Sequence, residues 1–298
     1  MSQTPIEWTD YVWNPTRGCS RVSEGCRNCY AERIAARFSQ GFGDSHKEQG
    51  PFAGYAIRTD SGPRWTGKVE LIESKLLEPL HWKKPRRVFV NSMSDLFHEN
   101  LPDESIDRVF AVMETTRHIT YQVLTKRAQR MREYLSNWRR AGSLLKEQGR
   151  RPLDNVWIGV SVENQATADE RIPELLRTPA AIRFVSYEPA LEQVNFTPFL
   201  DPVSFSIGLG MRRGIGWGII GGESGPGARP FDIEWARNTI RQFKAAGVPL
   251  FVKQLGARPV WNFPNVSNSE VAQLKDSKGG DWAEWPADLR VREFPCTK

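Results

Sequence analysis

The chain has 298 residues, of which 39% are apolar and 26% charged, so it can bury a sizeable core and is not disordered throughout. Its 41 Lys and Arg residues against 35 Asp and Glu give a net charge of +6, which permits a polyanionic partner without requiring one. The sequence contains no run of about 18 apolar residues, which a membrane-spanning helix would need. Its N-terminus also lacks the basic and apolar regions of a secretory signal. We therefore expect a cytoplasmic protein without membrane contact.

Short apolar runs separated by helical stretches predict an α/β fold. The N-terminal run 6–8 predicts a strand, and apolar positions at helical spacing predict helices at 103–116 and 234–246. Such alternation favours a parallel sheet, as a partial or complete parallel (β/α) barrel of about six to seven units or as an open doubly wound sheet. Six further runs are near-continuously apolar, as strands buried on both faces should be: 88–90, 121–124, 156–160, 182–185, 217–220 and 250–252.

The remaining segments predict the domain organisation. We assign residues 1–256 to the barrel and 257–298 to an irregular, tryptophan-rich C-terminal cap packed on the same domain. Residues 40–67 are rich in Gly and Ser and are interpreted as an insertion or lid loop, and residues 201–216 as a second irregular stretch.

Three of the four cysteines lie within eleven positions, as Cys19-x6-Cys26-x2-Cys29. Without an export signal, this spacing indicates a metal site rather than disulfides. Soft thiolates bind zinc or iron–sulfur clusters. Three ligands on one loop suit a [4Fe–4S] cluster with one open iron, which in radical chemistry binds the amino and carboxylate groups of S-adenosyl-L-methionine.

Other interpretations of the cysteines stay open. A Cys3His zinc site would take His98 or His46 as its fourth ligand, and the thiols could also carry no metal at all. Gly18 and Gly25 each precede a cysteine, which frees the backbone where it must wrap a cluster. Cys296, far away in the sequence, is expected to be a surface thiol.

Several strings resemble the phage Gp37/Gp68 family, also called DUF5131. The opening string IEWTDYVWNPTRGCSRVSEGCRNCYAER lies at 6–33. The others follow it in order along nearly the whole chain: NSMSDLFHE (91–99), LTKRAQRM (124–131), NVWIGVSVENQ (155–165), SYEP (186–189), IIGGESGPGARP (219–230) and FVKQLG (251–256). The resemblance implies a radical-S-adenosylmethionine-like barrel with a three-cysteine motif. It says little about the substrate.

The chain departs from mainstream radical enzymes in two ways. Their first cysteine gap has three residues and here has six, and Asn28 stands where they have an aromatic residue, with Tyr30 following the last cysteine. Their GGE-type segment usually follows the second strand. Here Gly221, Gly222 and Glu223 come late, so this segment could face the substrate instead.

Polar side chains follow the predicted strands at the edge where barrel enzymes carry their sites. We expect Asp95, Lys126, Glu188 and Lys253 to be catalytic. The alternative is a buried ion-pair network that closes the barrel. His98, Ser94, Ser186, Ser224 and Gln254 are further strand-end candidates. The residues expected to bind the cofactor are Ser92, Arg127, Ser161, Glu163, Asn164, Gly221, Gly222 and Glu223, with Arg127 or Lys126 taking its carboxylate.

The segment 221–229, GGESGPGAR, is typical of a tight anion-binding turn, although it matches neither a dinucleotide nor a Walker motif. Alternatively, its glycines merely let two backbones approach closely.

Positive charge is concentrated in one region. Residues 81–151 hold 15 Lys or Arg and 8 Asp or Glu, a net charge of +7. Basic groups interleaved with Trp and Tyr suit a nucleic-acid partner, or they form an ordinary solvated face.

Together these features predict a radical S-adenosylmethionine enzyme that generates a 5′-deoxyadenosyl radical and acts on a nucleic-acid base or lesion. Such an enzyme needs an electron donor, a reductase or flavodoxin-type protein. The alternatives are a zinc- or cluster-stabilised nucleic-acid-binding module, and a metal-dependent nuclease that uses Asp95, Glu163 and Glu188.

Overall fold

The computed structural model describes residues 4–39, 50–136, 152–200, 214–261, 270–271 and 274–296. The chain divides into two compact units. The first comprises Met1–Ile158 and Thr178–Ala181, and the second comprises Gly159–Arg177 and Ile182–Lys298. The expected limit between barrel and cap after residue 256 stays a prediction.

Seven strands form the main sheet, and their order along it is their order along the chain. A doubly wound sheet reverses its order at a switch point, and this sheet has no reversal. The order of the described strands ends at β12 without returning to β1, so the partial form of the predicted barrel is confirmed. The strands are β1 (Tyr11–Trp13), β6 (Arg86–Val90), β7 (Ile119–Thr125), β8 (Val156–Val162), β9 (Ile182–Tyr187), β10 (Trp217–Gly221) and β12 (Leu250–Gln254).

Within each unit the pairings of the main sheet given next are parallel, as expected. Strand β6 pairs with β1 and β7 in the first unit, and β10 pairs with β9 and β12 in the second. All residues of β8 and β10 are buried. Burial on both faces explains why the apolar runs of these strands are uninterrupted.

The N-terminal strand predicted at 6–8 is wrong. The backbone N–H of Thr9 donates to the Ile6 carbonyl, which closes a turn over those residues. The chain joins the sheet only after Asp10, and the strand covers Tyr11–Trp13, opposite Val88–Val90. The six other predicted strands are confirmed.

Helices of the first unit follow its strands. Helix α3 (Asp103–Thr115) starts after Pro102 and buries Ile106, Val109 and Phe110, as its spacing predicts. Helix α4 (Ala128–Ser136) begins three residues after β7 ends. Helix α2 (Glu73–Leu76) and the 3-10 turn η2 (Glu78–His81) precede β6.

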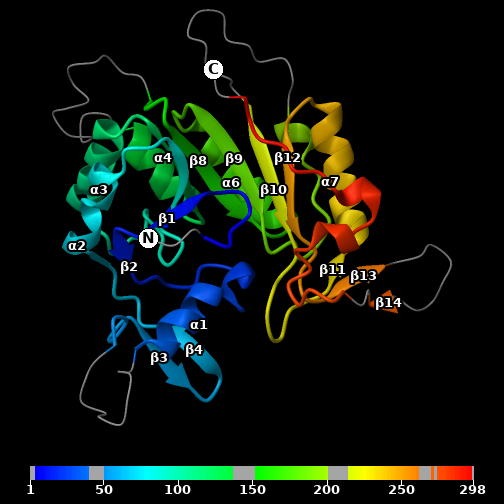
Figure 1. The fold of residues 1–298 in the computed structure, drawn as a ribbon, viewed down its shortest axis with the longest axis horizontal. Helices are drawn as coiled ribbons and strands as arrows, with labels where there is room; N and C mark the ends of the chain where they lie inside the picture. Colours follow the sequence, from blue (N-terminus) through cyan, green and yellow to red (C-terminus); the bar gives the residue numbers. More distant parts are fainter. Residues whose placement is uncertain are drawn as a thin grey trace, which may run out of the picture. The chain divides into compact units, whose positions relative to one another are not determined.

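The cysteine segment of the first unit has its own small scaffold (Figure 1). Strand β2 (Thr16–Arg17) pairs with β5 (Glu70–Leu71), and the 3-10 turn η1 (Glu24–Cys26) precedes helix α1 (Tyr30–Arg37). A hairpin of β3 (Ala56–Thr59) and β4 (Gly62–Trp65) packs against α1. The predicted insertion at 40–67 thus contains this hairpin, while 40–49 lies outside the described residues.

In the second unit, helix α6 (Gln165–Arg177) precedes β9, and α7 (Ile233–Ala245) packs against β10 and β12. Helix α7 confirms the helix predicted at 234–246. Most of the irregular stretch predicted at 201–216 lies outside the described residues. Shorter elements of this unit are η3 (Thr197–Phe199), β11 (Phe231–Asp232), β13 (Pro259–Trp261), β14 (Glu270–Val271), η4 (Trp282–Glu284) and η5 (Ala287–Leu289).

The segment after residue 256 packs on the second unit. Strand β13 pairs with β11, and the backbone N–H of Val252 in β12 donates to the Val291 carbonyl. Trp285 is buried, and its indole N–H donates to the Gly279 carbonyl at 3.0 Å. Among the described helices, none is both long and apolar enough to cross a lipid bilayer.

Candidate functional site

The chain enters the cysteine loop through a position that only glycine can occupy. Gly18 has φ +93°, and a Cβ atom placed there would lie 1.9 Å from the Lys68 carbonyl oxygen. Gly18 also forms an isolated parallel bridge with Ser94, in the loop that follows β6. The backbone before Cys19 is therefore held against the end of a sheet strand. Gly25 lies in η1 and has no positive φ, so its backbone angles are open to other residues as well.

The three clustered thiols share one electrostatic environment. Burial raises the pKa of Cys19 to about 12, and the negative charges of Asp95, Cys29 and Cys26 add to that rise. Burial also raises the pKa of Cys29, while the amides of Glu32 and Ala31 and the charge of Lys126 oppose it. The charges of Cys26 and Cys29 thus each act on another of the three thiols. The metal site expected at these cysteines stays a prediction. Cys296 is an exposed free thiol, as expected.

The first turn of α1 begins at the third cysteine. Cys29 is the residue that caps the helix N-terminus, where unpaired amides favour negative charge. The Tyr30 hydroxyl donates to the Ser92 carbonyl at 2.7 Å, which ties this turn to the loop after β6. The Ser92 hydroxyl itself donates to Asn14 Oδ1 at 3.2 Å. The contacts of Ser92 thus support the cysteine segment.

Both ring nitrogens of His98 have partners within the chain. Its side chain is fully buried, Nδ1 accepts from the Asn100 N–H at 3.1 Å, and Nε2 lies 2.9 Å from Ser20 Oγ. Because Nδ1 accepts, the neutral ring carries its proton on Nε2 and donates to Ser20. Burial lowers the pKa of His98, and the nearby Arg127 charge lowers it further. His46 lies outside the described residues.

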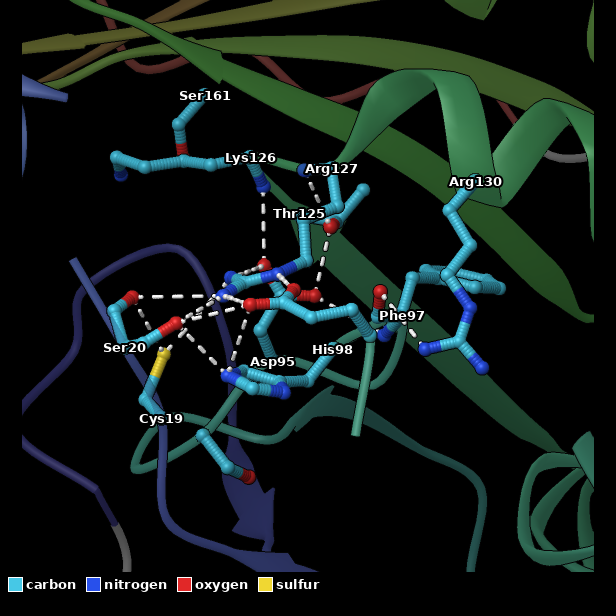
Figure 2. A network of polar contacts seen from close by, with 12 residues as sticks. Cys19, Ser20, Asp95, Phe97, His98, Thr125, Lys126, Arg127, Arg130 and Ser161 are labelled. Atoms are coloured by element: carbon cyan, nitrogen blue, oxygen red, sulfur yellow. Dashed lines mark hydrogen bonds and ion pairs between the residues drawn. The ribbon is translucent and has the colours of Figure 1, made fainter. Parts of the chain in front are cut away.

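Arg127 is the centre of a polar network beside Cys19 (Figure 2). Its Nε donates to Glu99 Oε2 at 2.5 Å, and Nη1 lies 3.2 Å from Asp95 Oδ2 and 4.0 Å from Cys19 Sγ. Its Nη2 donates to Ser20 Oγ at 2.7 Å. The Arg127 hydrogen bond holds the pKa of Glu99 well down, at about 2. Figure 2 shows Cys19 and Ser20 of the cysteine loop and Asp95 of the loop after β6 around the Arg127 guanidinium.

Asp95 occupies the inner side of this network. Its Oδ1 accepts from Thr125 Oγ1 at 2.7 Å and from the Phe97 N–H at 3.0 Å. Its Oδ2 accepts from the Lys126 N–H and from Arg127, both at 3.2 Å. Four donors satisfy this buried carboxylate, so its contacts are those of a residue that positions the strand ends. The catalytic role expected for Asp95 stays a prediction.

A second ion pair clamps the loop between Cys19 and Cys26. Arg21 Nε donates to Glu32 Oε2 at 2.9 Å, and the Trp65 N–H donates to Glu32 Oε1 at 2.8 Å. The Glu32 side chain is only 1% exposed. This carboxylate therefore joins the loop, helix α1 and strand β4.

In the second unit, the acidic group at the end of β8 forms the ion pair that the packing alternative expects. Glu163 Oε2 lies 2.9 Å from Arg171 Nη1, and both side chains are at most 3% exposed. Arg171 also donates to the Ser161 carbonyl at 2.8 Å. Asn164 Oδ1 accepts from the Thr167 N–H at 2.9 Å, within the first turn of α6. These three predicted cofactor residues, Ser161, Glu163 and Asn164, thus have structural contacts.

The ends of β9 and β12 carry a more accessible pair. Glu188 Oε1 lies 2.5 Å from Lys253 Nζ, and their side chains are 20% and 16% exposed. Both residues were predicted as catalytic, and the structure brings them together. Ser186 lies on β9, shortly before Glu188, and is buried.

The turn after β10 supports the close-approach interpretation of its glycines. A Cβ atom at Gly222 would lie 2.4 Å from the Leu255 carbonyl oxygen, and Gly222 exchanges hydrogen bonds with Gln254. Glu223 pairs with Arg229 through its carboxylate, at 2.6 Å and 3.0 Å. The turn's own arginine thus faces the turn's own acid. Gly221 lies beside Glu188, and Ser224 has an interaction partner.

A family model described as "Protein of unknown function (DUF5131)" matches residues 3–286. The chain belongs to the DUF5131 family. Neither the comparison with curated proteins nor that with solved structures found a match. For this DUF5131 protein, the site must therefore be interpreted from its own residues.

Sequence reasoning missed the residues that hold the cysteine loop of this DUF5131 protein. Glu32 carried a usable signal, since it lies beside Ala31, Ala35 and Ala36 on the apolar face of α1, where a carboxylate needs a partner. Ser20 and Glu99 carried none, because their partner Arg127 lies about a hundred and about thirty positions away along the chain. Within the described residues, no three His, Cys, Asp or Glu side chains converge as ligands of one ion.

Proposed function

We propose that this DUF5131 protein is a radical S-adenosylmethionine enzyme whose [4Fe–4S] cluster is held by Cys19, Cys26 and Cys29. The observation that supports the proposal most is the shared electrostatic environment of the three thiols, with cationic Arg127 beside Cys19 and Lys126 acting on Cys29. Thiols that repel one another when ionised need a positively charged group among them.

The donor set fits a cluster better than a single zinc ion. Zinc takes four ligands at about 2.0–2.3 Å, so its ligands converge on one point. The described residues contain no such convergent set, and both ring nitrogens of His98 already have partners. A cluster binds each thiolate at a different iron, so its ligands lie farther apart. Three thiols also leave one iron open for the cofactor.

When bound and reduced by an external electron donor, the cluster would pass one electron to the sulfonium of S-adenosylmethionine, whose C5′–S bond would break to give methionine and a 5′-deoxyadenosyl radical. The residues of the chain hold and orient these groups. Gly18, Tyr30 and the Arg21–Glu32 pair set the path of the cysteine loop. In the second unit, Glu188 and Lys253 form a part-exposed acid–base pair suited to moving a proton.

The substrate class that we propose is a nucleic-acid base or lesion. The net charge of +7 over residues 81–151 supports this choice. Lys83 and Lys84 are exposed, although other cations of the stretch face acids, as Arg108 faces Glu73 and Arg130 faces Asp103. Residues 137–151 lie outside the described residues.

The nuclease alternative has weaker support than the thiol centre. A nuclease needs carboxylates that are free to bind a divalent cation. Asp95, Glu163 and Glu188 instead each face a cation of the chain. We therefore place the reactive centre at the cysteines.

The test is anaerobic reconstitution with iron and sulfide, followed by metal analysis and reduction in the presence of S-adenosylmethionine. We expect about four irons per chain and release of 5′-deoxyadenosine. A reconstituted protein without iron and sulfide, or one that binds zinc instead, would contradict the proposal.

Replacing single cysteines tests the ligand assignment. Cys26→Ala should abolish the cluster, because only two thiolates would remain to hold its four irons. Cys296→Ala is the matched control and should keep the iron content of the wild type, since that thiol is exposed and remote in sequence. Equal iron content in the two variants would show that the ligands are misassigned.

A further inference from the structure

The two neighbouring basic residues at the end of β7 have different surroundings. All three nitrogens of the Arg127 guanidinium have partners, and its side chain is only 8% exposed. Two of these partners are the carboxylates of Asp95 and Glu99. The carboxylate of a ligand would find no N–H group of Arg127 free to donate to it. It would also be repelled by the negative charges of Asp95 and Glu99.

Lys126 differs in direction and in contacts. Its backbone N–H donates to Asp95, but its side chain extends away from the Arg127 network (Figure 2). Within the described ranges, no hydrogen bond or ion pair of its ammonium group is found. The adjacent residue, Arg127, has its Nη1 4.0 Å from Cys19 Sγ, so Lys126 leaves the end of β7 beside the cysteine loop. An ammonium group with three rotatable donors near a cysteine ligand is suited to an anionic ligand.

We propose that Lys126 binds the carboxylate of S-adenosylmethionine, whereas Arg127 positions Cys19 and stabilises the reduced cluster. This division of roles rests on the proposed function. It reverses the assignment that the sequence favours, in which the planar fork of Arg127 takes the carboxylate and Lys126 is catalytic. The reversal follows from the saturation of Arg127 by its own chain.

The position of Arg127 has a further effect on the cluster. Its Nη1 lies 4.0 Å from Cys19 Sγ, and its Nη2 reaches both Ser20 Oγ and, at 3.5 Å, the Ser20 carbonyl. Positive charge and N–H groups near a cysteinyl sulfur favour the more negative, reduced state. Removing the charge of Arg127 should therefore lower the reduction potential of the cluster. Removing its hydrogen bonds to Ser20 should weaken the hold on Cys19.

The role of Lys126 is tested by ligand affinity in the reconstituted, unreduced protein. Lys126→Gln should weaken binding of S-adenosylmethionine about tenfold or more, the loss expected for a charge-assisted hydrogen bond. The same variant should bind decarboxylated S-adenosylmethionine as the wild type does. Lys126→Arg should recover most of the affinity, and Lys84→Gln, an exposed lysine on the same unit, is the control. Isothermal titration calorimetry measures all of these affinities.

The role of Arg127 is tested by redox titration followed by electron paramagnetic resonance. Arg127→Gln should give a lower midpoint potential or lose iron, and Arg127→Lys should restore part of either property. The affinity for S-adenosylmethionine of the cluster that remains should be unchanged. Arg108→Gln, in the exposed pair with Glu73, is the control.

The outcomes distinguish a failure of the proposed function from a failure of the roles given to Lys126 and Arg127. A wild type without a cluster overturns the proposed function. A clustered wild type whose Lys126→Gln variant binds S-adenosylmethionine equally well overturns the present inference, as does an Arg127→Gln variant with unchanged iron and potential. Loss of iron in both Lys126→Gln and Lys126→Arg would make Lys126 a structural residue and would equally overturn it.

Discussion

His98 illustrates how a single buried side chain fixes its own protonation state. Its Nδ1 faces a backbone N–H donor, so a second ring proton would have nowhere to go. The Ser20 hydroxyl accepts from the ring and donates onward to Glu99 Oε1 at 3.1 Å. This chain of bonds is consistent only with a neutral imidazole, in agreement with the lowered pKa of His98.

The neutral His98 predicts a pH dependence of stability in the metal-free protein. An unfolded histidine takes up a proton near pH 6.5, whereas the folded one does so at lower pH. The unfolded state then binds more protons, so stability should fall as the pH decreases from about 6.5 through the lowered pKa. Each unit of lowering corresponds to about 1.4 kcal/mol.

Urea unfolding at pH 7 and pH 5 measures this effect. His98→Gln keeps one donor and one acceptor but cannot titrate, so it should lose less stability over this range than the wild type. His81→Gln removes an exposed histidine and serves as the control. If His98→Gln and the wild type lose the same free energy of unfolding, His98 does not titrate as proposed.

Helix α1 shows that an amphipathic pattern does not reveal the main contact of an element. Its amphipathic spacing is plain, with Ala31, Ala35 and Ala36 buried. The partners of Glu32 are a side chain eleven positions before it and an amide thirty-three positions after it. Pairing over such distances depends on the hairpin that packs against α1, and periodicity contains no information about it.

The Arg21–Glu32 pair predicts a stability contrast. Glu32→Ala should cost about 2 kcal/mol or more, because it leaves the Trp65 N–H and a half-buried guanidinium without their acceptor. Glu32→Gln should cost less, since its amide oxygen can still accept from Trp65. Chemical denaturation measures both.

The control for this contrast is Glu73→Gln, which removes an acid from the exposed Arg108 pair. Its effect should be small, because exposed pairs are screened by solvent. A Glu73→Gln variant that is destabilised as strongly as Glu32→Ala would refute the clamp.

For the whole molecule, every strand of the main sheet except β1 could be predicted, because buried parallel strands appear as uninterrupted apolar runs. Their order could not be predicted, since such runs are equally consistent with a barrel and with a doubly wound sheet. The chain has 11 tryptophans, and packing explains more than half of them. The buried ones are Trp8, Trp13, Trp82, Trp157, Trp217 and Trp285. The grouping of the three cysteines could also be predicted from their spacing. Which of Lys126 and Arg127 is free to bind a ligand could not, since it depends on Glu99 and Asp95 meeting Arg127 in space.

The tail predicts that the second unit does not survive truncation at residue 256. Trp285 and Leu289 are buried, and Glu293 and Val291 exchange backbone bonds with β12. A chain ending at residue 256 should therefore be cleaved by trypsin within residues 214–256 far faster than the full chain. A chain ending at Pro295 is the control and should resist like the full chain. Equal resistance of the 256-residue chain would show that the tail is dispensable.

The same tail has a consequence for solubility. Among the described strands, β12 is the last of the main sheet, so one row of its backbone N–H and C=O groups faces no described strand of that sheet. The tail covers that row: Val252 N–H donates to Val291, Glu293 N–H donates to Leu250, and Phe251 forms an antiparallel bridge with Arg292. An uncovered apolar edge would pair with the edge of another copy and begin aggregation. Residues 291–293 thus prevent the edge of β12 from pairing with a second copy of the protein.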